Sequence, residues 1–140
     1  MARLFTLLAF TTCTVMLKGI KSLQTTPHPS GTYWGDIGAL EFNASNPTFA
    51  MSIRVLECAI EAQGLQYGVG KFDKYDQMYP VYVNYEGTDL EHWVHLCGNP
   101  RIHLADFGLM WFYFNPSNNE NAIELKSLRG EWDGLFKYAD

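Results

Sequence analysis

The chain has 140 residues, of which 47% are hydrophobic and 15% aromatic, and its 10 basic and 15 acidic residues give a net charge of −5. This length suits one domain with a short appendage. An acidic chain with scattered Lys and Arg is a poor ligand for nucleic acid or anionic membranes, because phosphate contacts supply most of that affinity. We therefore expect no nucleic-acid partner.

The N-terminus has the features of a secretory signal peptide. Arg3 gives a positive start, and residues 4–17 form a mostly apolar run without charge. That run is too short to span the ~30 Å hydrocarbon core of a bilayer, and two lysines follow it. We expect cleavage near Ser22, with residues 1–22 as the signal peptide, secretion to the extracellular space and no membrane span. An amphipathic or buried N-terminal segment is the alternative.

The cysteines agree with export. Cys13 leaves with the signal peptide, whereas Cys58 and Cys97 remain as a pair in an oxidising compartment. We predict a disulfide between them. Loss of the signal peptide leaves 7 basic and 15 acidic residues, a net charge of −8. Asn43 begins the sequence Asn-Ala-Ser, a glycosylation sequon in a turn-like setting.

The rest of the chain is divided into a leader and a single domain. Residues 23–31 are rich in Pro, Thr and Ser and predict an extended leader, and residues 32–140 predict one β-domain. Alternating or apolar runs between turn signals predict about eight short strands. The expected strand segments are 32–34 with 39–43, 48–60, 67–72, 78–85, 90–97, 101–105, 109–114, 122–128 and 135–138.

Three of these segments form the expected centre of the domain. Residues 48–60 alternate most clearly, although residues 55–63 also contain good helix formers. Residues 90–97 end in a cysteine and are expected as a strand. Residues 109–114 are apolar on both faces, which predicts burial on both sides. The fold class that follows is all-β and mainly antiparallel, a small β-sandwich or β-barrel with one disulfide.

The histidines do not predict a metal site. His92, His95 and His103 lie close in sequence, with Asp89 and Glu91 beside them. Zinc needs several ligands on one side of an element, and on a strand His92 and His95 face opposite ways. We expect no metal and no cofactor.

No catalytic motif is present in the sequence. There is no G-x-S-x-G segment, phosphate-binding loop or dinucleotide fingerprint. A ribonuclease-like set remains open, in which His92 or His95 acts with His103 and with Lys71 or Lys126. The acidic charge makes an RNA substrate unfavourable.

The aromatic residues are the most informative feature that remains. They either line a ligand- or protein-binding face, where Trp and Tyr are enriched, or fill the core of a small domain. We expect most of them in the core. The candidate binding residues are Trp93, Trp132, Tyr82 and His95. The full aromatic set is Trp34, Tyr67, Tyr79, Tyr82, Trp93, Trp111, Phe112, Tyr113 and Trp132.

Three local features carry a family resemblance. They are Gly31-Thr32-Tyr33 with Gly38 soon after, the Trp93-x-x-x-Cys97-Gly98-Asn99 segment, and the aromatic run 111–114. Over residues 31–115 the chain resembles small secreted fungal β-barrel proteins of the Alternaria major-allergen type. Those proteins carry more cysteines, and the long interval between Cys58 and Cys97 differs from theirs. The resemblance implies a non-catalytic secreted barrel and assigns no functional residue.

These observations favour a secreted, disulfide-bonded β-domain that acts by binding. The expected partner is a host or other extracellular protein, or a small apolar ligand, as for a pathogen effector or an immune-modulating factor. A small nuclease-like hydrolase that uses histidines is the alternative. A lipocalin-like carrier is the second alternative, and it would need an internal cavity.

Overall fold

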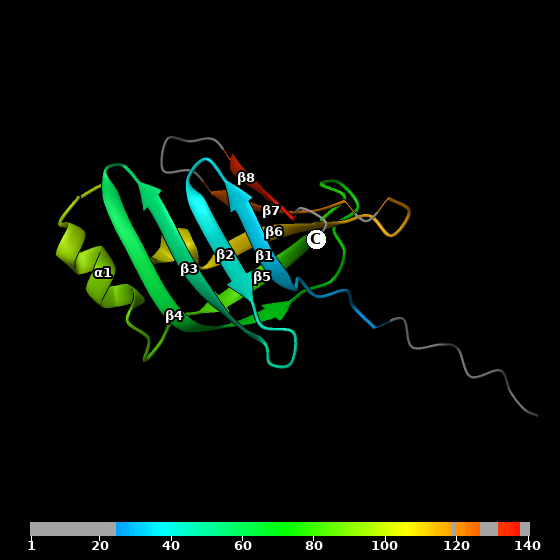
Figure 1. Cartoon of the computed structure of the whole chain (residues 1–140), viewed down its shortest axis with the longest axis horizontal. Helices are drawn as coiled ribbons and strands as arrows, with labels where there is room; N and C mark the ends of the chain where they lie inside the picture. Colours follow the sequence, from blue (N-terminus) through cyan, green and yellow to red (C-terminus); the bar gives the residue numbers. More distant parts are fainter. Residues whose placement is uncertain (1–24, 119, 127–131, 138–140) are drawn as a thin grey trace, which may run out of the picture.

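A computed structural model of the protein describes residues 25–118, 120–126 and 132–137. The predicted signal peptide lies outside these residues. Eight strands pair in sequence order, each antiparallel to the next, and close into a barrel (Figure 1). The prediction of an antiparallel all-β fold is confirmed, and the barrel is the form it takes. The strands are β1 (Gly31–Gly35), β2 (Gly38–Phe42), β3 (Thr48–Val55), β4 (Cys58–Val69), β5 (Tyr79–Asn84), β6 (Leu109–Phe114), β7 (Asn121–Lys126) and β8 (Trp132–Phe136).

The barrel closes where β1 meets β8. Trp34 lies directly opposite Phe136 at this seam. The two backbones come close beside it, since a Cβ added at Gly35 would lie 2.6 Å from the carbonyl oxygen of Gly134. Glycine at this position therefore permits the closure.

The expected strand over residues 48–60 is two strands joined by a tight turn. The chain reverses at Leu56 and Glu57, where φ is 47° and 67°, and Val55 then pairs with Cys58. The prediction of one strand is wrong. Val55 and Cys58 both face the core although they are three residues apart, so the inward positions change from odd to even numbers at the turn. The apolar residues on both sides of the turn resemble one continuous strand. The alternative helix over residues 55–63 is also wrong.

Substituting Glu57 by glycine is expected to stabilise the barrel by about 0.5–1 kcal/mol. Two-residue hairpin turns with positive φ at both positions favour glycine at the second, because a side chain there clashes with its own backbone. Glu57 is exposed, so no packing is lost. Thermal unfolding of Glu57→Gly beside Glu57→Ala measures the effect. Equal midpoints for the two variants would contradict it.

Residues 90–97 form a helix, α1 (Leu90–Cys97), and not the expected strand. Leu90, Trp93, Val94 and Cys97 are spaced three and four apart, which is the period of one helix face. These four side chains are the ones that pack toward the core. Gly98 ends the helix with φ 63°, a left-handed conformation that glycine adopts without strain.

The expected strand over residues 101–105 is also absent from the described structure. The chain there forms a turn and then a short 3₁₀ helix, η1 (Leu104–Phe107). The backbone N–H of His103 donates to Oδ2 of Asp106 (2.8 Å), a local bond that competes with strand pairing. Ile102 and Phe107 are buried, so this segment contributes to the core without joining the sheet.

Helix α1 is attached to the β3–β4 hairpin at one end of the barrel (Figure 1). The predicted disulfide is present: Cys58 is bonded to Cys97, with the Cα atoms 5.5 Å apart. Nδ2 of Asn99 donates to the carbonyl oxygen of Leu56 (3.4 Å). The covalent link and the hydrogen bond therefore hold the C-terminal end of the helix against the turn.

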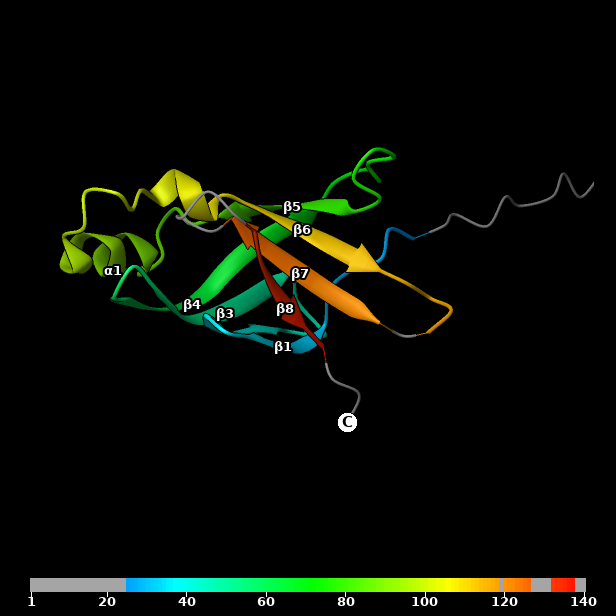
Figure 2. The ribbon, with the colours of Figure 1, turned by 90° about the horizontal axis from the view of Figure 1, so that it is seen from above.

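The interior of the barrel is occupied by its own side chains. Aromatic rings gather toward the end opposite α1, where Phe42 stacks on Phe49 with ring centroids 4.9 Å apart. Tyr67 meets Phe42 edge-on and donates from its hydroxyl to the carbonyl oxygen of Pro29 (3.2 Å). Figure 2 shows, from above, how the strands are inclined to one another around the barrel that encloses these side chains. The largest fully buried side chains are Tyr33, Leu40, Met51, Ile60, Leu65, Leu90, Phe107, Met110, Phe112, Ile123, Leu125 and Leu135.

Stability is expected to fall as the pH rises from 10 to 12. Burial raises the pKa of Tyr33 from 10.0 to about 12, although a backbone hydrogen bond at Ser30 partly lowers it, and burial also raises the pKa of Tyr67. The unfolded chain ionises first, so the stabilisation is complete below pH 10 and disappears toward pH 12. Two pKa units for Tyr33 correspond to about 3 kcal/mol. Urea unfolding at several pH values tests this, and Tyr33→Phe should show a shallower decline; an equally steep one would contradict it.

Candidate binding surface

Aromatic side chains gather on the outer wall of the barrel around the β1–β8 seam. Inward and outward residues alternate along a strand; Tyr33 and Leu135 face the core, which turns Trp34 and Phe136 outward. Trp34 is 56% exposed and Phe136 is 55% exposed, although they lie directly opposite each other. Two large aromatic side chains therefore stand side by side in solvent.

This pair belongs to a longer apolar row. Phe136 lies opposite Ala122 on β7, which lies opposite Tyr113 on β6. On the other side, Trp34 lies opposite Ala39 on β2. We call Tyr113, Ala122, Phe136, Trp34 and Ala39 the seam row. A surface hollow of about 470 Å³ lies beside Tyr113 and Phe136, with small Ala122 among its lining residues.

Two of the predicted binding residues lie on the outer wall of the barrel. Tyr82 is 58% exposed on β5, and Trp132 is 45% exposed on β8. Tyr82 lies opposite Leu109, and Trp132 lies opposite Lys126. Between these two pairs, Met110 on β6 lies opposite Leu125 on β7. Tyr82 and Trp132 are therefore three strands apart, about 14 Å along the wall at ordinary strand spacing.

The other two predicted binding residues lie on α1 and not on this wall. Trp93 is partly buried and packs against the core. His95 is exposed, and its carbonyl oxygen accepts the backbone N–H of Gly98 at the end of the helix (3.1 Å). The structure does not bring the four predicted residues into one site, because Trp93 and His95 belong to helix α1 and not to a strand of the sheet.

The expectation that the aromatic residues mostly fill the core is wrong for Trp34 and Trp132, whereas Trp93 packs against the core. Trp34 and Trp132 are exposed, and Trp93 and Trp111 are only partly buried. The expectation that residues 109–114 are buried on both faces is also wrong. Met110 and Phe112 face the core, whereas the outward face of β6 stays partly exposed.

The helix changes the arrangement of the histidines. His92 and His95 are three residues apart on α1, so they lie on neighbouring positions of its surface and not on opposite faces. Among the described residues, no group of three or more His, Cys, Asp or Glu side chains is placed to hold a metal ion. Lys71 follows the end of β4, whereas α1 is held along the first half of this strand by the Cys58–Cys97 bond and by the hydrogen bond between Gln63 and Asp89, so the second half of β4 separates Lys71 from the helix.

The sequon lies in the exposed β2–β3 connection. Oδ1 of Asn43 accepts the backbone N–H of Ser45 (2.8 Å) and of Asn46 (3.3 Å), which folds the loop into a turn. The Asn43 side chain is exposed. Glycosylation at Asn43 stays a prediction that this geometry accommodates.

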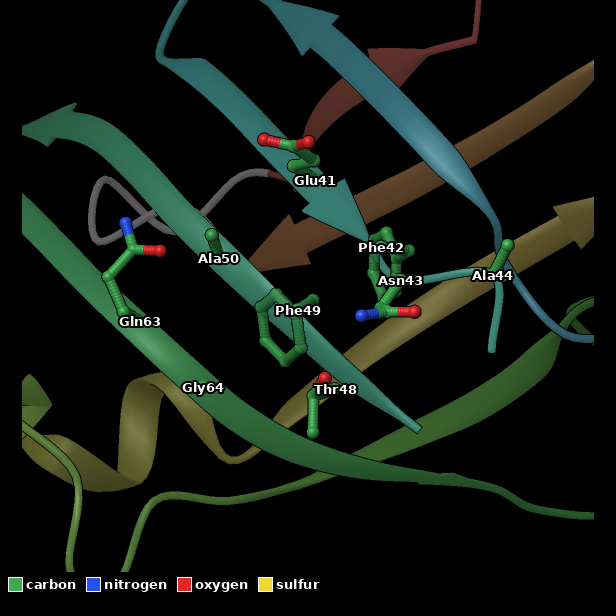
Figure 3. Close-up of a pocket in the computed structure, with 9 residues that line it drawn as sticks. All are labelled: Glu41, Phe42, Asn43, Ala44, Thr48, Phe49, Ala50, Gln63 and Gly64. Atoms are coloured by element: carbon green, nitrogen blue, oxygen red, sulfur yellow. The ribbon is translucent and has the colours of Figure 1, made fainter. Parts of the chain in front are cut away.

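A second feature of the outer wall is a groove across β1 to β4. Two adjoining hollows of about 410 and 460 Å³ share Glu41, Ala50 and Gln63 as lining residues. Trp34 and Ala39 line the first of them as well. We call these five residues the Glu41 groove. Figure 3 shows Glu41 and Gln63 on either side of the small Ala50 side chain.

A β-bulge shapes this groove. Phe49 lies opposite Leu65 and Met51 lies opposite Ala62, so Gln63 and Gly64 together oppose the single residue Ala50. The bulge frees the backbone N–H of Gln63, which donates to Oδ1 of Asp89 at the start of α1 (3.1 Å). Bulges redirect side chains and are frequent beside functional sites.

Phe136, Glu41 and Gln63 were not predicted as site residues, and Trp34 was predicted only as one of the aromatic residues. The alternation of Trp34 with Tyr33 was the available signal, since one of two neighbouring aromatics on a strand must face outward. Glu41 and Gln63 had no such signal, because their proximity depends on the register of β2, β3 and β4.

No known protein family, curated protein or solved structure matches the chain. Within the part of the chain that the structure describes, no helix is both long and apolar enough to cross a membrane. The resemblance to secreted fungal barrels stays a prediction from the sequence.

Proposed function

We propose that the protein is a secreted binding module that engages a host or other extracellular protein through the outer wall of its barrel. The observation that carries this proposal is the exposed Trp34–Phe136 pair at the seam. Exposed groups of large aromatic side chains mark interaction sites on soluble proteins, and Trp and Tyr are enriched at binding hot spots. Secretion and the effector or immune-modulating role are predictions from the sequence.

The occupied interior favours an outer site over a carrier function. Lipocalin-like carriers hold their ligand inside the barrel. Here Met51, Ile60, Met110 and Leu135 face inward from four different strands, and each is fully buried by its neighbours. The polar and aromatic groups that remain accessible are on the outside, where a partner meets them without opening the fold.

The proposal is tested by capture of extracellular host proteins on the immobilised protein. The variant combines Trp34→Ala with Phe136→Ala, and the matched control is Tyr75→Ala. Tyr75 is 98% exposed in the connection between β4 and β5, away from the seam. Truncation of hot-spot aromatic residues typically costs at least 2 kcal/mol, so affinity should fall by about thirtyfold or more.

Circular dichroism and thermal unfolding should show that both proteins remain folded, since the altered side chains are exposed. A partner that binds the double variant and the wild type equally would contradict the proposed surface. Loss of binding in Tyr75→Ala alone would move the site to the β4–β5 connection.

A further inference from the structure

We propose that the Glu41 groove binds an arginine side chain from a basic segment of the protein partner. This inference rests on the proposed function, since it names the chemistry of that partner. It follows from three groups that converge on the groove: the Trp34 ring, the Glu41 carboxylate and the Gln63 amide.

Trp34 and Glu41 are close enough to act on one group. Trp34 lies opposite Ala39, and Glu41 follows two residues later on the same outward face of β2. Such diagonal neighbours have their Cα atoms about 7–8 Å apart, within reach of long side chains. A guanidinium stacked on the indole can thus donate hydrogen bonds to the carboxylate beside it.

Gln63 supplies an acceptor on the other side of the groove. Its side chain and that of Glu41 flank Ala50, and the alanine leaves a shallow floor between them (Figure 3). The carbonyl oxygen of the Gln63 amide accepts hydrogen bonds from N–H groups. A planar guanidinium has five donors in a fixed fork, so it can use both acceptors, whereas a lysine ammonium acts as a point charge.

The charge of the surroundings favours a cation. The chain carries a net charge of −5. The described residues that line the two hollows include Glu41 but no Lys or Arg. Arg54 lies on the same face of β3, four positions from Ala50, or about 13 Å along the strand. Lys137 lines the separate hollow beside Phe136.

The same charge disfavours a second copy of this chain as the occupant, because two acidic surfaces repel each other. A neutral polysaccharide could stack on Trp34, but it would gain nothing from the charge of Glu41. A basic protein segment can stack on the Trp34 ring, bind the Glu41 carboxylate and be attracted by the net negative charge of the chain. It is therefore the occupant that the groove favours.

The test is a titration of the oxidised protein at low salt with a blocked hexapeptide of alternating glycine and arginine, followed by NMR. We expect shifts at the Trp34 indole N–H and at the amides of Ala50 and Gln63. The lysine counterpart should bind about threefold or more weakly. The glutamate counterpart and a neutral chitin hexasaccharide should leave these signals unshifted.

Glu41→Gln removes the charge and keeps the shape, and it should weaken arginine-peptide binding by roughly fivefold. Glu61→Gln is the matched control. Glu61 is an exposed carboxylate on β4, opposite Ser52, and it lines neither hollow. Its substitution should change the affinity less than twofold.

Several results would overturn the inference. They are equal binding of the arginine and lysine peptides, an equal effect of the two glutamine substitutions, or binding of the hexasaccharide that survives Glu41→Gln. A dimer in sedimentation that disappears in Trp34→Ala would assign the groove to a second copy. If Trp34→Ala with Phe136→Ala abolishes partner capture but Glu41→Gln leaves it unchanged, the proposed function stands and this inference falls.

Discussion

Replacing Gly38 by alanine is expected to prevent folding of the barrel or to lower its free energy of unfolding by more than about 4 kcal/mol. Gly38 has a φ of +134°, which a residue with a side chain rarely adopts. An added Cβ would also collide with the carbonyl oxygen of Ser52 and would lie 2.8 Å from Cα of Ile53. Both neighbours are backbone atoms of β3, so the clash is relieved only by separating β2 from β3.

The yield of soluble protein and its thermal unfolding measure this effect. Gly87→Ala is the control, because Gly87 also has a positive φ, of +72°, but an added Cβ meets no atom within 4 Å. That variant should lose only about 1 kcal/mol, the cost of the backbone conformation. Equal stability of the two variants would show that β2 and β3 do not approach each other as closely as described.

Removing the disulfide is the second substitution with a large expected effect. Cys58 and Cys97 are 39 residues apart in sequence. Closing a loop of this length stabilises a protein by roughly 4 kcal/mol in the chain-entropy estimate. For a domain of this size the thermal midpoint should then fall by about 10–20 °C. Cys58→Ala with Cys97→Ala avoids an unpaired thiol.

Thermal unfolding of the double variant, and of the wild type with and without reductant, measures the loss. The reduced wild type should approach the double variant, because α1 then depends on packing and on the hydrogen bonds of Asp89 and Asn99. An unchanged midpoint under reductant, with two thiols free to alkylate, would mean that the bond contributes nothing.

Local alternation predicted most of the sheet, because each strand carries its own inward and outward residues. It failed over residues 48–60, 90–97 and 101–105, in each case for a physical reason. Two-residue turns such as Leu56-Glu57 usually carry Asn or Gly, so a turn without either resembles a continuous strand. Residues 90–97 have helical spacing, but Trp93, His95 and Cys97 also satisfy a period of two, and so short a segment fits both patterns.

The disulfide was predicted from the even number of cysteines and the expected export, whereas the contact between Trp34 and Phe136 was not predicted. Tyr82 and Trp132 were predicted as candidate binding residues, and both are exposed on the outer wall. Trp34 and Phe136 are about 100 residues apart in sequence and meet only because β1 pairs with β8. The closure of a barrel is a non-local event, and no local pattern in either strand encodes its partner.

Hydrogen exchange of the protein in complex with its captured partner tests most directly the claim that the outer wall binds. We predict that the amides of β1 (Gly31–Gly35) and β8 (Trp132–Phe136) exchange more slowly in the complex than in the free protein, while those of α1 do not change. Slower exchange confined to α1, with none at the seam, would contradict the account.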